Sequence, residues 1–367
     1  MKVPLLDLTR FNKEIVEKWL EQVRGVILSG RFLNGPYKKD FEEKFAQYLG
    51  VKHCLGVASG TDAIFLSLKA FDIGPGDEVI THANAFIADI EPIVAIGAVP
   101  ILVDKSESGY GPDLEQLKKA VNTKTKAILV VHLLGVPAEM DELLKISEES
   151  GVPIIEDASQ AQGASINGKK VGSLGKIGAF SLGPVKNLRA VGDAGAISTN
   201  DSILYEKVRQ LAHHGEQSKY LHTIYGWNSR LDEIQATWLL FGLEVLDGRN
   251  KRRVDIYKRY KEAFRDLPLA PMSESINGES VYHQGIFYAD DREAFKKYLD
   301  EKEIGNGAYY PYPLHLQEAW SRSGLPAGSF PRAEEYSKDN IALPVFAELT
   351  EEEIQYVISN VRDFFLK

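Results

Sequence analysis

Apolar residues in the first part of the chain recur at helical spacing. One face of the first predicted helix carries apolar residues four positions apart: Phe11, Ile15, Trp19, Val23 and Ile27. The pattern stops at Ser29, and Gly30 follows as a residue that commonly ends helices. A second helix is predicted over residues 38–49, again with a glycine, Gly50, directly behind it.

From residue 51 onward, short apolar runs alternate with helical patterns. Strands are predicted over residues 53–59, 77–83, 99–104, 126–134 and 152–159. Helices are predicted between them over residues 61–71, 88–97, 113–121 and 139–150. Strands that are apolar on both faces and alternate with helices are typical of a parallel sheet covered by helices on both sides. We therefore predict an α/β fold with a doubly wound, mostly parallel sheet.

The pattern changes twice in the rest of the chain. Two shorter strands, 176–183 and 194–200, follow without a long helix between them, and a long helical region then runs from near Arg230 to Phe264. The apolar residues of this helix cover more than one face, which indicates burial or an interface and favours a homodimer. After residue 247, short strands and helices mix with several prolines. We predict a large domain over residues 1–247, with an N-terminal helical segment, and a smaller α+β domain over residues 248–367.

Composition restricts the function. The 367 residues include 43 Lys and Arg against 52 Asp and Glu, and the net charge of −9 argues against a nucleic-acid or anionic-membrane partner. The single cysteine, Cys54, lies in an apolar run, so a disulfide framework is excluded. No stretch approaches the ~20 apolar residues of a membrane-spanning helix. We expect a soluble cytoplasmic protein.

Some familiar motifs are present only in part. The segment "GASINGKK", residues 163–170, begins like a phosphate-binding P-loop, but it lacks the Ser or Thr that should follow the lysine. Its Asn167-Gly168 pair predicts a hairpin turn instead. No G-x-G-x-x-G follows any predicted strand, which disfavours a nicotinamide-dependent oxidoreductase. His213-His214 lacks metal-ligand spacing, so no metal site is predicted.

A possible anion site lies at the carboxyl end of the first predicted strand. Ser59, Gly60 and Thr61 stand where this strand turns into its helix, at the edge where parallel sheets bind ligands. The glycine allows close approach of the backbone, and the first N–H groups of a helix attract phosphate. The alternative is an ordinary helix cap by Ser59 or Thr61.

A carboxylate ends another predicted strand. Asp157 ends the strand of Ile154 and Ile155, and Gln160 follows three residues later. A carboxylate here is either a turn former or the partner of a cationic ring nitrogen. At about 4 Å and an effective dielectric near 20, that attraction is on the order of 4 kcal/mol before desolvation. Asp157 could therefore keep a pyridinium ring protonated.

One lysine lies in a turn after the strand at residues 176–183. Lys186 stands in "SLGPVKN", between two apolar runs. A lysine that forms Schiff bases must be desolvated, so that a fraction of it is neutral near pH 7. Apolar flanks and a tight turn would supply this environment. Ser181, five residues earlier, could give a hydroxyl group to the same phosphate as Gly60 and Thr61.

The order of these motifs resembles the sugar aminotransferases of the DegT/DnrJ/EryC1/StrS family, which are pyridoxal-phosphate enzymes of the aspartate aminotransferase fold (type I). The resemblance runs through nearly the whole chain. It is carried by "SGRFLNGP", "SGTDAI", "ANAFIADIE", "VHLLGVPAEMD", "EDASQAQGA", "VGSLGKIGAFSLGPVKN", "GDAGAI", "GWNSRLDEIQA", "YYPYPLHLQ" and "FPRAEE".

The resemblance implies a role for each motif residue. Lys186 would form the Schiff base with the cofactor, and Asp157 would pair with its ring nitrogen. Gln160 would bond the ring hydroxyl, and Phe86 would stack on the ring; the alternative for Phe86 is a core position. Three residues would hold the cofactor phosphate: Gly60, Thr61 and Ser181. Asn228 would reach that phosphate from the other subunit, so that two subunits share each active site.

The remaining candidates concern the substrate. Six residues could contact its sugar or diphosphate, with ordinary surface or fold roles as the alternative: Lys219, Tyr220, Arg230, Tyr309, Tyr310 and His315. For Arg230, that alternative is an ion pair with Asp232 or Glu233.

This chain also departs from the family at several positions. Gly183 and Val185 replace the aromatic residue or His and the Thr that commonly flank the proline before the lysine. Asp89 stands where Thr is frequent, Tyr309 where His is frequent, and Trp227 where Tyr, Phe or Val is more usual. We expect these last three residues on the substrate side.

The resemblance implies a ping-pong transfer of an amino group from L-glutamate to a keto group of a nucleotide-linked sugar, through the pyridoxamine form of the cofactor. The segment "KNLRAVGDAGAI" favours a dTDP-linked 3-keto-6-deoxyhexose. The alternatives are a UDP-linked 3-keto sugar, a 4-keto sugar or a keto-cyclitol. Family members that act as 3-dehydratases carry His at the lysine position, so Lys186 disfavours that reaction. A non-catalytic regulatory protein of the same fold is the alternative of another class.

Overall fold

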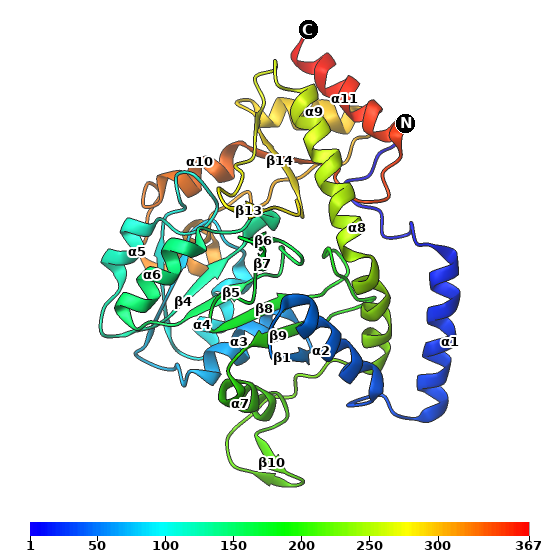
Figure 1. The fold of residues 1–367 in the computed structure, drawn as a ribbon. Helices are drawn as coiled ribbons and strands as arrows, with labels where there is room; N and C mark the ends of the chain where they lie inside the picture. Colours follow the sequence, from blue (N-terminus) through cyan, green and yellow to red (C-terminus); the bar gives the residue numbers. More distant parts are fainter. Residues whose placement is uncertain (367) are drawn as a thin grey trace.

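A seven-stranded sheet forms the centre of the molecule in the computed structural model, which describes residues 1–366 apart from the side chains of residues 321–323 (Figure 1). Its spatial order is β1-β9-β8-β5-β4-β2-β3. The strands are β1 (His53–Val57), β2 (Glu78–His82), β3 (Val99–Val103), β4 (Thr125–Val131), β5 (Ile154–Asp157), β8 (Ile177–Ser181) and β9 (Gly195–Thr199).

The sheet is mostly parallel, as the sequence predicts. Four neighbouring pairs, from β3 through β2, β4 and β5 to β8, run parallel. Strand β9 is antiparallel to both β8 and β1. Because β1 and β8 both oppose β9, they point the same way, and the carboxyl ends of β1, β5 and β8 meet at one edge.

Helices cover both faces of this sheet (Figure 1). The helices of this part are α1 (Lys13–Ser29), α2 (Pro36–Leu49), α3 (Gly60–Ala70), α4 (Glu91–Ala95), α5 (Leu114–Ala120), α6 (Met140–Ser150), α7 (Ser202–Ala212) and α8 (Glu233–Ala263). Strand side chains alternate between two cores, since Ile128 and Val130 of β4 pack with α2, α5, α6 and α8, whereas Leu129 packs with α3, α4 and α7. Burial on both faces explains the continuous apolar runs of the strands.

Helix α7 is absent from the sequence prediction, which has no long helix directly after residue 200. Its signals are nevertheless present. Asp201 caps the helix by accepting hydrogen bonds from the N–H groups of Ile203 and Leu204. Val208 and Leu211 then recur at helical spacing and are buried.

The partial P-loop motif forms a hairpin, as predicted. Strands β6 (Ser165–Ile166) and β7 (Lys169–Lys170) are antiparallel, and β13 (Gly278–Glu279) adds a third strand. Asn167 and Gly168 form the turn with positive φ angles of 49° and 77°. This combination of φ angles is characteristic of Asn-Gly turns in two-residue hairpins.

The C-terminal part forms a smaller α+β layer above the sheet in Figure 1. It contains β12 (Ala270–Pro271), β14 (Gly285–Tyr288), β15 (Asn340–Leu343), α9 (Arg292–Glu301), α10 (Pro331–Asp339) and α11 (Glu351–Phe365). Short 3₁₀ segments complete the chain: η1 (Ile87–Asp89), η2 (Leu133–Gly135), η3 (Leu314–Leu316) and η4 (Glu318–Ser323). The N-terminus joins this layer, because Val3 pairs with Ile304. The division at residues 247 and 248 stays a prediction, and it falls inside α8, which runs unbroken through both parts.

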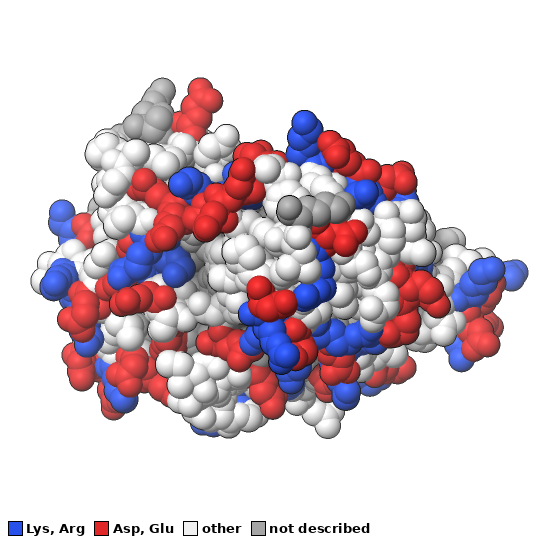
Figure 2. Space-filling view, turned by 90° about the horizontal axis from the view of Figure 1, so that it is seen from above, with Lys and Arg blue, Asp and Glu red and all other residues white. Residues whose placement is uncertain are grey.

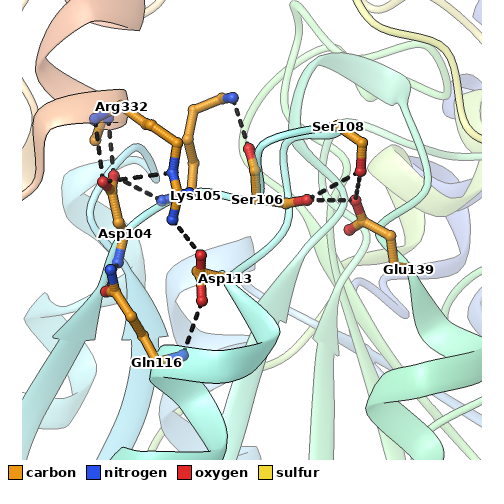
Figure 3. Close-up of polar contacts among 9 residues, drawn as sticks. Asp104, Lys105, Ser106, Ser108, Asp113, Gln116, Glu139 and Arg332 are labelled. Carbon is orange, nitrogen blue, oxygen red and sulfur yellow. Dashed lines mark hydrogen bonds and ion pairs between the residues drawn. The ribbon is translucent and has the colours of Figure 1, made fainter.

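A polar cluster joins α10 to the end of β3 (Figure 3). The carboxylate of Asp104 accepts hydrogen bonds from the N–H groups of Arg332 and Ala333 at 3.0 and 2.9 Å. These are N–H groups of the first helical turn, so Asp104 acts as a cap supplied by a distant strand. The Arg332 guanidinium also bonds Asp113, which caps α5 through the N–H group of Gln116. The cluster therefore fixes the smaller layer on the sheet.

The surface is mixed in charge. On the face seen from above, acidic and basic side chains are interspersed over the smaller layer (Figure 2). Within the described residues, no helix combines the length and apolar character needed to cross a membrane.

Candidate active site

Lys186 lies in the turn that follows β8. The turn is closed by a hydrogen bond from the N–H group of Lys186 to the carbonyl oxygen of Gly183, at 3.0 Å. Burial lowers the pKa of the Lys186 ammonium group, and the carboxylates of Asp157 and Asp89 oppose this effect only in part. A lowered pKa increases the neutral fraction of a lysine, which is the nucleophilic form. Lys186 therefore has the environment required for Schiff-base formation.

Asp157 ends β5, the strand beside β8, so both residues reach the same edge of the sheet. Its side chain is buried, with 7% exposed, and Oδ1 accepts a hydrogen bond from the N–H group of Ser159 at 2.9 Å. Its charge acts on Lys186 across the site. The structure thus brings the predicted lysine and aspartate together.

Gln160 and Phe86 both contact Tyr310. The Gln160 side chain accepts a hydrogen bond from the N–H group of Leu134 at 2.7 Å and donates one to the Tyr310 hydroxyl at 2.9 Å. The rings of Phe86 and Tyr310 stack with their centroids 5.0 Å apart. Phe86 is half exposed, so it is not a core residue. One predicted substrate residue therefore contacts two predicted cofactor residues.

The start of α3 is pressed against the end of β8. A Cβ atom added to Gly60 would lie only 2.5 Å from Cβ and 2.8 Å from Cα of Ser181. Glycine is required for this approach, because non-bonded carbon atoms prefer about 3.5–4.0 Å. Within the described chain, no acceptor bonds the N–H groups of Gly60 and Thr61, while Ser59 caps the helix through Asp62. These N–H groups and Ser181 form a cradle that fits a phosphate.

Asp89 lies deeper than expected. The sequence places it on the substrate side, but it is 1% exposed and faces Asp157, so this expectation is wrong. The reason is the η1 turn after β2, in which Asp89 Oδ2 accepts the Phe86 N–H group at 3.0 Å and draws the side chain inward. Burial and the charge of Asp157 raise the pKa of Asp89 well above its usual range.

Two buried residues behind Lys186 escape the sequence prediction. Asn187 Oδ1 and His283 Nδ1 are 3.2 Å apart, and burial together with the positive charge of Lys186 lowers the pKa of His283. The Asn187 amide also donates to Asn250 Oδ1 at 2.9 Å. Asn187 could have been noticed as the neighbour of Lys186, whereas His283 belongs to the distant C-terminal part and has no sequence signal.

The substrate candidates fall into two groups. Tyr309 and Tyr310 adjoin the site, and the Tyr309 carbonyl accepts a hydrogen bond from the Tyr336 hydroxyl. His315 is buried, and its Nε2 lies 2.9 Å from Glu334 Oε1. Lys219 and Tyr220 lie instead on the hairpin of β10 (Glu216–Ser218) and β11 (Leu221–His222), which projects from the body below α7 (Figure 1).

Arg230 has neither of the partners considered for it. Among the described residues it makes no ion pair with Asp232 or Glu233. Glu233 instead accepts hydrogen bonds from N–H groups at the start of α2, including those of Gly35 and Lys38 at 3.0 Å each. Asp232 caps α8 through the N–H group of Gln235. The alternative of a local ion pair on α8 is therefore wrong.

Of the remaining departures, Gly183 is buried, whereas Val185 and Trp227 are exposed. Val185 is 47% exposed, and a Cβ atom on Gly183 would meet only Ser181 Oγ, at 3.7 Å. Trp227 is half exposed and packs on Phe65, with ring centroids 4.6 Å apart. Asn228 beside it is exposed as well. Nothing within the chain explains why Val185 replaces the more common residue.

Known proteins resemble this chain over its whole length. The family model described as the DegT/DnrJ/EryC1/StrS aminotransferase family matches residues 13–362. A "pleiotropic regulatory protein" of Geobacillus stearothermophilus is 40% identical over 100% of this chain and 99% of its own. A dTDP-3-amino-3,6-dideoxy-alpha-D-galactopyranose transaminase of Aneurinibacillus thermoaerophilus is 39% identical over 99% of each chain.

Solved structures agree with the fold. DesV of S. venezuelae, in complex with a ketimine intermediate, has a TM-score of 0.97 and 37% identity, covering 100% of this chain and 99% of its own. NtdA of Bacillus subtilis, with bound cofactor PMP, has a TM-score of 0.93 and 30% identity, covering 100% of this chain and 86% of its own. The predicted resemblance and the predicted fold class are both confirmed.

Proposed function

Because the chain belongs to the DegT/DnrJ/EryC1/StrS aminotransferase family, we propose that it transfers an amino group to a keto group of a nucleotide-linked sugar. Pyridoxal phosphate is the cofactor, and when bound it supplies an electron sink and carries the amino group between substrates. The single observation that carries the proposal is that a partly buried Lys186, with its lowered pKa, and Asp157 lie at one sheet edge.

The residues of this chain have separate tasks in the proposed reaction. Lys186 would hold the cofactor and would accept and donate a proton during the transfer. Asp157 would pair with the cofactor ring nitrogen, and Gln160 would bond the ring hydroxyl. Phe86 would stack on the ring and exclude water. The orientation of Gln160 by the Leu134 N–H group supports its role.

The cofactor phosphate is assigned to the start of α3. The N–H groups of Gly60 and Thr61, which have no acceptor among the described residues, and the hydroxyl of Ser181 supply donors, and the positive end of the helix dipole favours the anion. The close approach of Gly60 to Ser181 supports this assignment, since it brings a helix start and a strand end to one point.

The substrate is assigned as a dTDP-linked 3-keto-6-deoxyhexose, with L-glutamate as the amino donor. The name of the Aneurinibacillus relative, a dTDP-3-amino sugar transaminase, supports the dTDP group and the third carbon. The "KNLRAVGDAGAI" segment points the same way. Tyr309 and Tyr310 are assigned to the sugar, because they adjoin Phe86 and Gln160.

Further contacts, to the substrate by Lys219 and Tyr220 and to the cofactor phosphate by Asn228, are assigned to a homodimer. Lys219, Tyr220 and Asn228 stand on exposed segments, and the same region exposes Tyr225 to 98%. On α1, Leu28 is 78% exposed. Exposed apolar side chains on these segments support a second copy of the chain as their cover. Asn228 and the hairpin would then complete the site of the partner.

A regulatory protein without turnover is the second candidate, favoured by the name of the Geobacillus relative. Absorbance separates the two candidates. Purified protein should be yellow, borohydride should remove the band, and glutamate should shift it. A yellow protein that glutamate leaves unchanged would support the regulator or an amino donor other than glutamate. A protein that stays colourless after addition of pyridoxal phosphate would refute both candidates.

The Lys186→Ala variant tests the assignment of the nucleophile. We expect it to lose the borohydride-sensitive band and at least about 10³-fold in turnover, as loss of a covalent and general-base residue does. Unchanged turnover would refute the role. A screen of dTDP- and UDP-linked keto-sugars with glutamate then identifies the substrate, and light scattering of the purified protein measures the number of subunits.

A further inference from the structure

Asp89 has a carboxylate oxygen that the protein leaves without a donor. Its Oδ2 accepts the Phe86 N–H group at 3.0 Å, whereas Oδ1 is fully buried and has no hydrogen-bond partner in the described part of the chain. The residue is 1% exposed. A buried ionised carboxylate with one bare oxygen is costly, so the side chain needs a proton or a partner.

The group that faces Asp89 is another carboxyl. Asp157 raises the pKa of Asp89 through its charge and its side-chain proximity. Neither carboxylate can donate a hydrogen bond unless it is protonated. Two ionised carboxylates at this range repel, and one of them therefore keeps its proton. Of the two residues, Asp89 has the buried oxygen without a partner in the described chain, whereas Asp157 Oδ1 accepts the Ser159 N–H group, so a proton is better accommodated on Asp89.

The other titratable groups around the pair do not remove this conflict. Lys186 acts on Asp89, and it favours the charged form only as a minor influence. His82 also interacts with Asp157, but burial lowers its pKa to about 4, so it adds no positive charge near pH 7. Tyr310 also faces the pair, and its hydroxyl is neutral because burial and the two carboxyls raise its pKa. One positive and two negative groups would leave a net negative charge in a buried site.

We propose that Asp89 and Asp157 form a carboxyl pair that shares one proton, with Asp89 as the protonated member that donates a hydrogen bond to Asp157. Asp89 is thus a positioning residue. Its O–H group orients the Asp157 carboxylate and stabilises the charge on it. The geometry of the pair does not depend on the proposed function, but its use does: Asp157 would meet the cofactor ring as an oriented anion with a single negative charge.

The proton can be detected in the full chain freed of cofactor. Infrared spectroscopy at pH 7 should show a carbonyl band of a protonated carboxylic acid, and the band should disappear in Asp89→Asn. Asparagine replaces the acid with a neutral group that can still donate a hydrogen bond to Asp157 and accept one from Phe86. The surface variant Asp363→Asn is the matched control and should keep the band.

The pH dependence of unfolding provides a second readout. Burial and Asp157 raise the pKa of Asp89, so the folded chain retains a proton that the unfolded chain loses above the usual Asp pKa of about 3.9. Stability must then fall as pH rises through this window. Relative to Asp89→Asn, the folding equilibrium constant of the natural protein should fall about tenfold per pH unit above pH 5, until the pair ionises.

The holoenzyme shows whether the pair serves the cofactor. Asp89→Asn should keep the absorbance band and its pH profile close to the natural protein, whereas Asp89→Leu, which cannot donate, should shift that profile. The proposal is overturned if the infrared band is absent at pH 7, or persists in Asp89→Asn. Equal pH slopes of unfolding for the natural chain and Asp89→Asn would also overturn it. A protein with the band but without aminotransferase activity would refute the proposed function alone.

Discussion

Replacing Gly60 by alanine tests how closely α3 must approach β8. The new Cβ would lie 2.5 Å from Cβ and 2.8 Å from Cα of Ser181. Ser181 ends an inner strand of the sheet, so its backbone cannot yield cheaply, and a displacement of about 1 Å is needed to restore normal carbon contacts. Overpacking of this kind costs about 1–3 kcal/mol, and the better helix propensity of alanine returns at most about 1 kcal/mol. We expect a net loss of about 1–2 kcal/mol.

The same displacement should reduce the affinity for the cofactor more than it reduces the stability of the fold. Moving the first N–H groups of α3 removes one charge-assisted hydrogen bond, worth about 1.5–3 kcal/mol, which corresponds to about 10- to 150-fold in Kd. Urea unfolding followed by circular dichroism measures the first effect, and absorbance titration with pyridoxal phosphate measures the second.

A matched control is available on α8. Gly248 is exposed in the middle of this helix and has no atom within 4 Å of an added Cβ. Gly248→Ala should therefore stabilise the protein by about 0.5–1 kcal/mol and leave cofactor affinity unchanged. If Gly60→Ala gained as much stability as the control and bound the cofactor equally well, the steric reasoning would be refuted.

Three further changes test the supporting structure. Glu156→Gln removes a buried carboxylate that accepts hydrogen bonds from three backbone N–H groups and from His132. Urea unfolding should show that the free energy of unfolding falls by about 3 kcal/mol. A fall of less than about 1 kcal/mol would contradict this account. Burial lowers the pKa of His82 to about 4 from its ordinary 6.5, so the unfolded chain binds a proton first as pH falls. The free energy of unfolding should then drop by up to about 3 kcal/mol between pH 6.5 and 4, and a His82→Gln variant with the same slope would argue against this cause. Asp104→Ala removes the cap of α10 and should lower the free energy of unfolding by about 1–2 kcal/mol. It should also raise KM for the sugar, because Tyr336 of α10 bonds the Tyr309 carbonyl. An unchanged KM would show that the cap does not influence the site.

The large sheet could be predicted because its strands are buried on both faces. The apolar runs around Ile128 and Ile154 identify β4 and β5, and the helical patterns between the runs imply parallel crossovers. The direction of β9 could not be predicted in this way. Its residues Gly195–Thr199 are as fully buried as those of a parallel strand, so the apolar pattern is the same in either direction.

Only those site residues that lie at the ends of predicted strands could be predicted from the sequence. Lys186 and Asp157 are recognisable because Lys186 follows one predicted strand and Asp157 ends another, and the carboxyl ends of parallel strands meet at one edge. The contact of Asp89 with Asp157 depends on how the η1 turn folds, and no spacing in the sequence encodes it. The same is true of His283, which reaches Asn187 from the C-terminal part.

The unbroken course of α8 limits how this protein can be recombined with its relatives. A helix of 31 residues spans about 45 Å and carries side chains of both cores, including Leu239 at one end and Tyr257 at the other. A chimera joined at residue 247 would therefore combine two half-helices from different proteins, and each half would carry side chains suited to the core of its own parent. Exchange of the smaller layer, for a new sugar specificity, is better joined after Phe264, where the helix has ended and the host keeps its own α8.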